Sequence, residues 1–145
     1  MSTSIQVPEL KPCPFCDYLR GARPFTILTR TALTATLVTR EQRGLGHLLV
    51  IPIEHRQTLL DIRSDEASAI MASVITAARA ITGAYQAEGI AIWQNNGVPA
   101  HQAIPHVHFH IAGTLPDGGT EWDDVEEASL AETEVIAEKL RHFMQ

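Results

Sequence analysis

Residues 104–113 read Ile-Pro-His-Val-His-Phe-His-Ile-Ala-Gly and hold three of the chain's seven histidines at alternate positions. Side chains on a strand point to opposite faces with a period of two. A strand here therefore places His106, His108 and His110 on one face and the apolar side chains between them on the other. The apolar face fixes the register, because a slip of one residue would bury the histidines.

This row of histidines could be a solvated strand face, a metal clamp or a catalytic array. Strict alternation beside a loop that contains Gly and Asn is unusual for a plain solvated face. A rise of about 3.3 Å per residue separates the Cα atoms of His106 and His110 by roughly 13 Å, whereas zinc holds nitrogens at about 2.0 to 2.1 Å. Neighbours two residues apart can chelate one ion, so we expect at least one of the three histidines to be free for other chemistry.

The composition is that of a single globular domain. The 145 residues are 45% apolar and 19% charged, which suits a domain with a core of its own. A formal net charge of −6 argues against a sequence-independent nucleic-acid binder, which needs clustered Lys and Arg. No uninterrupted apolar run approaches the roughly 20 residues of a membrane span, and the first residues do not read as a signal peptide. We therefore predict a cytoplasmic protein with no membrane or nucleic-acid partner.

Both cysteines of the chain lie in one motif, Cys13-Pro-Phe-Cys16. In a reducing compartment such a pair is a redox motif or half of a zinc site. A redox pair is expected at the start of a helix that leads out of a strand, and no strand pattern precedes this one. The context favours metal over redox chemistry and leaves both open.

The remaining pattern predicts an α+β fold of one domain over residues 1–145, with an antiparallel sheet, a central helix and a C-terminal helix. The first half has the pattern of a β-meander. A Ser64 N-cap begins the central helix and Gly89 ends it. Ser129 and Glu132 form a capping box for the last helix, which follows an acidic, turn-rich segment. Strands are predicted at residues 25–29, 35–39, 47–52, 90–95 and 106–111, the central helix at residues 64–88, and the acidic loop with the C-terminal helix at residues 113–145.

The sequence resembles the histidine triad superfamily of nucleotide hydrolases and transferases. Residues 106–111 match its alternating triad signature, and residues 46–52, His55, residues 95–97 and Gln102 precede the triad in the family's order and approximate spacing. The amino-terminal CxxC is similar to that of the zinc-binding branch of the superfamily. The resemblance covers most of the chain and implies a homodimer that acts on a small nucleotide.

The resemblance implies two sites that share the histidine strand. A structural Zn²⁺ would be bound by Cys13, Cys16, His55 and His106, in a closed Cys₂His₂ set that fastens residues 1–20 to the sheet and takes no part in the chemical step. The alternative for His55 is an exposed loop histidine with no metal to bind. The alternative for His47 is a histidine at the end of a strand, with its hydrogen bonds satisfied and no catalytic role.

The second implied site is catalytic. His108 would attack the α-phosphorus of a nucleotide and form a phosphohistidine that water hydrolyses. His110 would hydrogen-bond the phosphoryl oxygens, and His47 would be a further active-site histidine. The nucleotide-binding set implied by the resemblance is Asn95, Gln102, His110 and Thr39.

Three positions depart from the family pattern. Thr39 stands where many members carry Asp or Asn for the ribose, Ala103 where a Ser or Thr often contacts phosphate, and His101 where a glycine is usual. The predicted function is a nucleotidyl hydrolase or transferase acting on a dinucleoside polyphosphate or nucleoside phosphoramidate. The alternatives are a zinc-stabilised nucleotide-binding or partner-binding module with weak or no catalysis, and a hydrolytic zinc enzyme that activates water.

Overall fold

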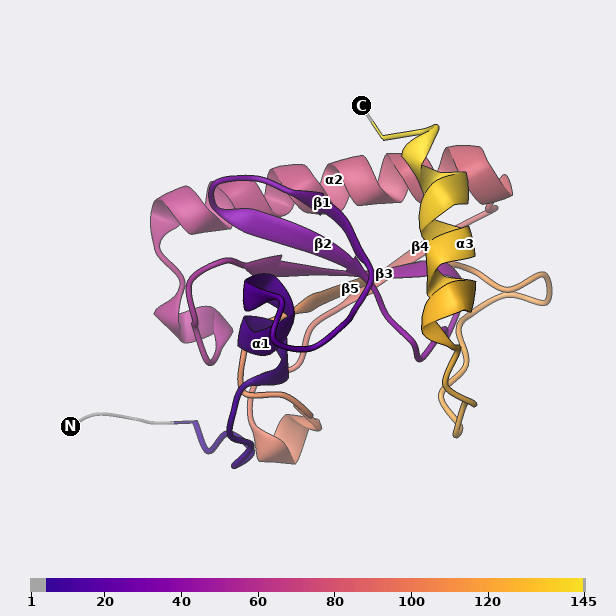
Figure 1. Ribbon diagram of the computed structural model, residues 1–145. Coiled ribbons are helices and arrows are strands. Elements are labelled where there is room, and N and C mark those ends of the chain that lie inside the picture. The colour runs from indigo at the N-terminus through magenta and orange to yellow at the C-terminus, as the bar shows by residue number, and fades with distance from the viewer. Residues whose placement is uncertain (1–4, 145) are drawn as a thin grey trace.

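The computed structural model describes residues 5–144. Five strands form one antiparallel sheet in the order β1-β2-β3-β5-β4 (Figure 1). The predicted α+β fold with an antiparallel sheet, a central helix and a C-terminal helix is confirmed. Residues 1–4 of the predicted amino-terminal arm and Gln145 lie outside the described residues. The elements are α1 (Pro14–Arg20), β1 (Ile27–Arg30), β2 (Thr34–Val38), β3 (Leu45–Pro52), η1 (Leu59–Asp61), α2 (Ser64–Tyr85), β4 (Ile90–Trp93), η2 (Val98–Ala100), β5 (Phe109–Gly113) and α3 (Leu130–Arg141).

The central strand β3 is buried on both faces, as its apolar run predicts. Leu48 and Val50 belong to the main core, which α2 and α3 cover from one side of the sheet. Leu49 and Ile51 belong to a smaller cluster on the other side, where α1 packs (Figure 1). The alternation along β3 therefore divides the molecule into a thick face that carries the long helices and a thin face that carries α1.

The histidine strand is shorter than predicted. β5 begins at Phe109, and His106 and His108 precede it because the backbone there leaves the ladder. The N–H of His106 donates to the Ile104 carbonyl, and that of Val107 donates to the Arg56 carbonyl. The predicted division of faces is confirmed within β5: His110 pairs with Leu49 on the thin face, while the flanking apolar residues pack in the main core.

Helix α2 differs from the prediction at both ends. The N-cap of α2 is Arg63 rather than Ser64, and the carboxylate of Glu66 accepts from the Arg63 N–H. The helix ends at Tyr85, where Gln86 takes a left-handed conformation with φ of 51°, and not at Gly89. By length and composition alone α2 could cross a membrane. Six of its side chains are buried, and those of Ile70, Val74 and Ile81 form part of the main core.

Helix α3 begins as predicted, because Ser129 and Glu132 form the reciprocal capping box. Helix α1 was not predicted. It begins directly after Cys13, whose Sγ accepts from the Cys16 N–H, so the CxxC motif does open a helix. The side chain of Phe15 is almost fully buried and anchors this short helix on the thin face.

Candidate metal centre and active site

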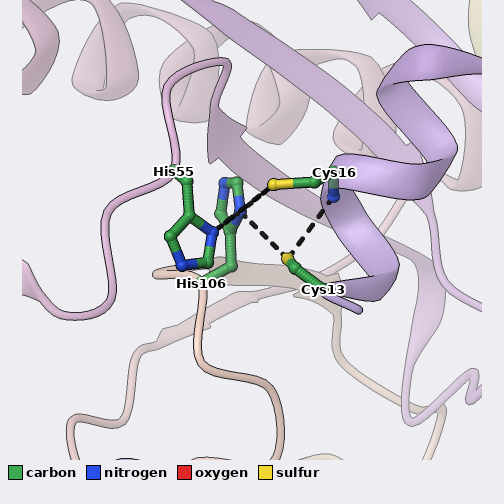
Figure 2. A group of neighbouring side chains, drawn as sticks. All are labelled: Cys13, Cys16, His55 and His106. Atoms are coloured by element: carbon green, nitrogen blue, oxygen red, sulfur yellow. Dashed lines mark hydrogen bonds between the residues drawn. The ribbon is translucent and has the colours of Figure 1, made fainter. Parts of the chain in front are cut away.

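Four side chains from three separate segments of the chain meet at the start of α1 (Figure 2). These are the four predicted metal ligands, Cys13, Cys16, His55 and His106, and one ligand atom from each lies within 4.8 Å of the others. The Sγ of Cys13 is 3.4 Å from Nδ1 of His106, and the Sγ of Cys16 is 3.4 Å from Nδ1 of His55. The structure thus brings together a Cys₂His₂ group that could hold a metal ion.

The spacing of these atoms fits tetrahedral zinc. A regular tetrahedron with Zn–S bonds of about 2.3 Å and Zn–N bonds of about 2.05 Å has N···N edges of about 3.3 Å and S···N edges of about 3.6 Å. The two Nδ1 atoms of His55 and His106 are 3.3 Å apart. The S···N separations include the two of 3.4 Å and a third of 3.7 Å between Cys16 and His106. The four ligand atoms are therefore already near the corners of such a site.

A hydrogen bond to the backbone of Pro52 fixes the ring orientation of His106. Its Nε2 lies 2.9 Å from the carbonyl oxygen of Pro52, which can only accept a hydrogen bond. Nε2 therefore carries the proton, and the lone pair of Nδ1 faces the two cysteines. Phe15 of α1 packs edge-on against both His106 and His108, at centroid distances of 5.6 and 5.2 Å. The metal group and the next histidine are thus joined by one buried aromatic ring.

His108 has its tautomer fixed in the opposite sense. Its Nδ1 lies 2.8 Å from the backbone carbonyl oxygen of His106 and must donate to it. Neutral His108 therefore has an unprotonated Nε2 with a free lone pair. Burial lowers the pKa of this imidazole. The ring is neutral, oriented and nucleophilic at Nε2, which are the properties that covalent catalysis at phosphorus requires.

His47 and His110 form a pair whose tautomers also follow from the backbone. The N–H of Arg43 donates to Nδ1 of His47 at 3.1 Å, so neutral His47 carries its proton on Nε2. That Nε2 lies 3.0 Å from Nδ1 of His110 and donates to it. The proton of His110 is then on Nε2. This chain of donors gives His110 an N–H that can be offered to an anionic oxygen.

Burial keeps this pair uncharged. It lowers the pKa of His47 to about 4, although the nearby Glu41 backbone favours the charged ring and opposes this, and the charges of Arg43 and His108 lower the pKa further. It lowers the pKa of His110 to about 2, with further lowering by His108 and His47. The backbone of His47 is held by Gln42, whose amide donates to the His47 carbonyl and accepts from its N–H. Both rings are therefore neutral at physiological pH, as the donor chain requires.

Two clefts meet at His108 and His110. The first cleft, of about 370 Å³, we call the apolar cleft because Phe15, Phe25, Leu49 and Ile104 line it. Its lining also includes polar and charged side chains, namely Tyr18, Arg23, Thr39, Arg40 and Glu127. The tryptophan cleft, of about 470 Å³, is lined by Trp93, Trp122, Arg43, Asn95 and His101. Glu41 and Ala103 line both clefts. A substrate that spans the junction would place its central atom at the two histidines and its two ends in different surroundings.

The predicted nucleotide-binding residues lie in different parts of this site. Thr39 lines the apolar cleft and Asn95 lines the tryptophan cleft. Gln102 is buried, and its amide bonds to the backbone of Gly97, Gln57 and Ile104, so in this structure it fastens the loop before the triad. His101 stands where the family usually has a glycine. Its φ of 65° is a left-handed conformation, which glycine adopts without steric cost.

Several residues of the site escaped the sequence analysis. Arg43 belongs to a charged connection whose role is visible only when its N–H is seen to meet His47. Trp93 stacks on His110 with ring centroids 4.7 Å apart, and Trp122 packs on Trp93 from a segment expected only to be an acidic loop. The sequence places Trp93 in the predicted strand of residues 90–95, but only the structure shows that it pairs with His110 of the triad.

Comparison with known proteins decides the family. A model of the HIT domain matches residues 20–117, more than half of the chain. This chain belongs to the HIT domain family. Among HIT relatives, the adenosine 5'-monophosphoramidase of Schizosaccharomyces pombe is 37% identical over 99 residues, which cover 68% of this chain and 71% of that protein.

Solved HIT structures share the fold. A HIT-like protein of Bartonella henselae superposes with a TM-score of 0.86 at 24% identity, over 95% of this chain and 99% of that chain. A zinc-bound histidine triad family protein of Mycobacterium smegmatis gives a TM-score of 0.77 at 23% identity, over 92% and 93% of the two chains. The HIT match includes His47, His55 and the triad and begins after Cys13 and Cys16, so the metal group is completed by residues outside it.

Proposed function

We propose that this HIT protein is a nucleotidyl hydrolase or transferase that cleaves at the α-phosphate of a nucleotide through a phosphohistidine on His108. The observation that carries the proposal is the fixed tautomer of His108, whose free Nε2 belongs to a buried, neutral ring at the junction of two clefts. The similarity to an adenosine 5'-monophosphoramidase supports the same conclusion. The substrate is a nucleoside phosphoramidate or a dinucleoside polyphosphate.

The nucleoside occupies the apolar cleft in this proposal. Phe15, Phe25, Leu49 and Ile104 form an apolar slot suited to a flat base. Thr39 also lines this cleft, and in the proposal its single hydroxyl meets the ribose; its Oγ1 already accepts from the N–H of Glu41. The phosphate then lies at His108 and His110, and the leaving group extends into the tryptophan cleft.

The reaction proceeds in two displacements. The lone pair of His108 Nε2 attacks the α-phosphorus, and the bond from phosphorus to the leaving group breaks. The leaving atom keeps that electron pair and takes up a proton from solvent. Water then attacks the phosphohistidine, the N–P bond breaks, and its electron pair returns to Nε2 while the proton of the water passes to solvent. The products are a nucleoside monophosphate and the released leaving group.

The other two histidines stabilise negative charge on the phosphoryl group and do not form a bond to phosphorus. His110 donates from Nε2 to a phosphoryl oxygen, and His47 keeps His110 in the tautomer that can do so. Asn95 contacts the phosphoryl group from the tryptophan cleft, and Gln102 acts by holding the loop on which Asn95 lies.

The metal in this proposal is Zn²⁺ held by Cys13, Cys16, His55 and His106. Two thiolates and two imidazoles are a closed donor set that zinc favours, and the atom spacing fits it. Zinc held by these residues would fasten α1 to His55 and to the first triad histidine, and its four protein ligands would leave no position for water. Cysteines that serve as metal ligands fit a reducing compartment, so the proposed location is the cytoplasm. The net charge of −6 argues against a nucleic-acid partner.

The protein acts as a homodimer in this proposal. β4 is an edge of the described sheet, and Ile92 on it is 52% exposed. Met71 and Ile75 of α2 are also exposed apolar side chains. An open strand edge and exposed apolar side chains suit contact with a second copy. Sedimentation velocity should give the mass of a dimer, and a monomer at micromolar concentration would contradict this part of the proposal.

The test is turnover by the wild type and His108→Ala over a panel of adenosine and guanosine phosphoramidates and dinucleoside polyphosphates. Wild type should release mononucleotide from at least one substrate, and His108→Ala should release essentially none. The matched control is His142→Ala, an exposed histidine beyond α3. If wild type is no faster than His108→Ala on every substrate, the hydrolase proposal is wrong and the chain is a binding module.

A further inference from the structure

The tryptophan cleft has an aromatic wall, formed by Trp93 and Trp122, to which the proposed reaction assigns no role. Trp93 pairs with His110 across β4 and β5, and the two rings are stacked, with planes 6° apart. Trp122 packs on Trp93 at a centroid distance of 5.2 Å and remains 69% exposed. The wall therefore begins at a catalytic histidine and ends at an indole that is open to a ligand.

Trp122 is held in place by its neighbours rather than being a free surface side chain. We call residues 120–128 the acidic strap. Its two ends are bonded to the connection before β3, where the N–H of Glu121 donates to the Arg43 carbonyl and the N–H of Ala128 donates to the Arg40 carbonyl. The guanidinium of Arg43 also donates to the Asp123 carbonyl at 2.7 Å. Hydrogen bonds on both sides of Trp122 thus hold the backbone that presents it to the cleft.

The charge around this wall disfavours an anionic ligand. The acidic strap contains five carboxylates and no basic residue. Arg43, the basic side chain that lines the tryptophan cleft, is paired with Glu41 at 3.2 Å. The carboxylate that lines the cleft is Glu41 itself, and of the strap only Trp122 lines it. A polyphosphate would therefore find no net positive charge in the lining, and the strap's carboxylates add negative charge on the neighbouring segment. A neutral or cationic group with a flat ring would instead gain stacking against the indoles.

We propose that the tryptophan cleft is a leaving-group subsite in which Trp93 and Trp122 select an amine that carries an aromatic ring. This inference rests on the proposed function and narrows its substrate to nucleoside phosphoramidates. In the first displacement the P–N bond breaks, its electron pair stays on the amine nitrogen, and that nitrogen takes up one proton from solvent to leave as a neutral amine. The free amine then takes up a second proton from solvent, so the product that departs past the strap is cationic.

The experiment compares two adenosine phosphoramidates, one of phenylethylamine and one of cyclohexylethylamine, which differ mainly in the π face of the ring. Diadenosine tetraphosphate is the anionic comparison. The kcat/KM of wild type should be about fivefold higher for the phenyl substrate than for the cyclohexyl substrate, as expected for one aromatic contact. It should be at least about tenfold lower for the tetraphosphate.

Substitutions test whether Trp122 causes the preference for the phenyl substrate. Trp122→Ala should bring the ratio of phenyl to cyclohexyl kcat/KM close to one, and Trp122→Phe should keep most of it. The matched control is Val135→Ala, an exposed apolar residue of α3 outside both clefts, which should leave the ratio unchanged. An unchanged ratio in Trp122→Ala, a wild-type ratio near one, or faster turnover of the tetraphosphate would each overturn the inference.

A binding measurement separates this inference from the proposed function. Trp93 and Trp122 are the two tryptophans of the chain, so tryptophan fluorescence reports on the subsite itself. In His108→Ala the phenyl substrate should quench this fluorescence at about fivefold lower concentration than the cyclohexyl substrate. Equal binding of the two would overturn the subsite. Selective binding without turnover by wild type would overturn only the hydrolase.

Discussion

Replacing His47 by Gln should flatten the dependence of folding stability on pH. Burial lowers the pKa of His47 to about 4 in the folded chain, against an ordinary value of 6.5. Between these pH values the unfolded chain binds the proton and the folded chain does not. The contribution of neutral His47 to stability is therefore complete above about pH 6.5 and is lost as the pH falls toward about 4.

The size of the effect follows from the two pKa values. Moving from pH 7 to pH 5 should cost roughly 2 kcal/mol of unfolding free energy through His47 alone. Gln keeps an oxygen that can accept from the Arg43 N–H and an amide that can donate to His110, so the fold has a replacement for both hydrogen bonds. Loss of His47 also removes one of the charges that lower the pKa of His110, which reduces the pH dependence further.

The assay is urea denaturation followed by circular dichroism at pH 7 and pH 5, for wild type, His47→Gln and the exposed control His142→Gln. The fall in unfolding free energy between the two pH values should be smaller in His47→Gln than in wild type by about 2 kcal/mol. Release of metal from the cysteine and histidine group affects all three proteins and cancels in the comparison. Parallel pH dependence of wild type and His47→Gln would refute the buried, neutral state assigned to His47.

Three other substitutions test separate parts of the site. Cys13→Ser should reduce the zinc content from about one ion per chain to near zero by elemental analysis, and a full complement retained in the variant would refute the ligand set. Thr39→Asp should raise kcat/KM for an adenosine phosphoramidate about tenfold, because a carboxylate accepts from both ribose hydroxyls, and an equal gain for the dideoxyadenosine analogue would contradict a ribose contact. Gln102→Leu leaves three backbone groups without their partner and should lower the unfolding free energy by roughly 3 kcal/mol in urea, whereas Gln94→Leu, at a less buried amide, should cost clearly less.

Much of the fold follows from local patterns in the sequence. The apolar run through β3 predicted a strand buried on both faces, and the capping box at Ser129 predicted the start of α3. Alternation in residues 106–111 predicted which face of β5 carries His110. These features depend on periods of two residues or on pairs three apart, so the sequence contains them without knowledge of tertiary contacts.

The parts that were not predicted depend on contacts between distant residues. Helix α1 is only seven residues long and is held by burial of Phe15, which no local period reveals. The early departure from the β5 ladder depends on a hydrogen bond from Val107 to Arg56. Arg43 and Asp123, which hold Trp122 over the site, are 80 positions apart. The resemblance to a family predicted the metal ligands and the triad from residue types. The histidine tautomers and the aromatic wall depend on distances between atoms that only the structure shows.

The most direct measurement of the central claim is the mass of the protein caught during turnover. Wild type mixed with an adenosine phosphoramidate, quenched within milliseconds at alkaline pH and digested, should yield a peptide that carries one adenylyl group on His108. His108→Ala should yield no adduct, and His142→Ala should yield the same adduct as wild type. An adduct on His110 or His47, or product release by wild type with no adduct at any quench time, would contradict His108 as the nucleophile.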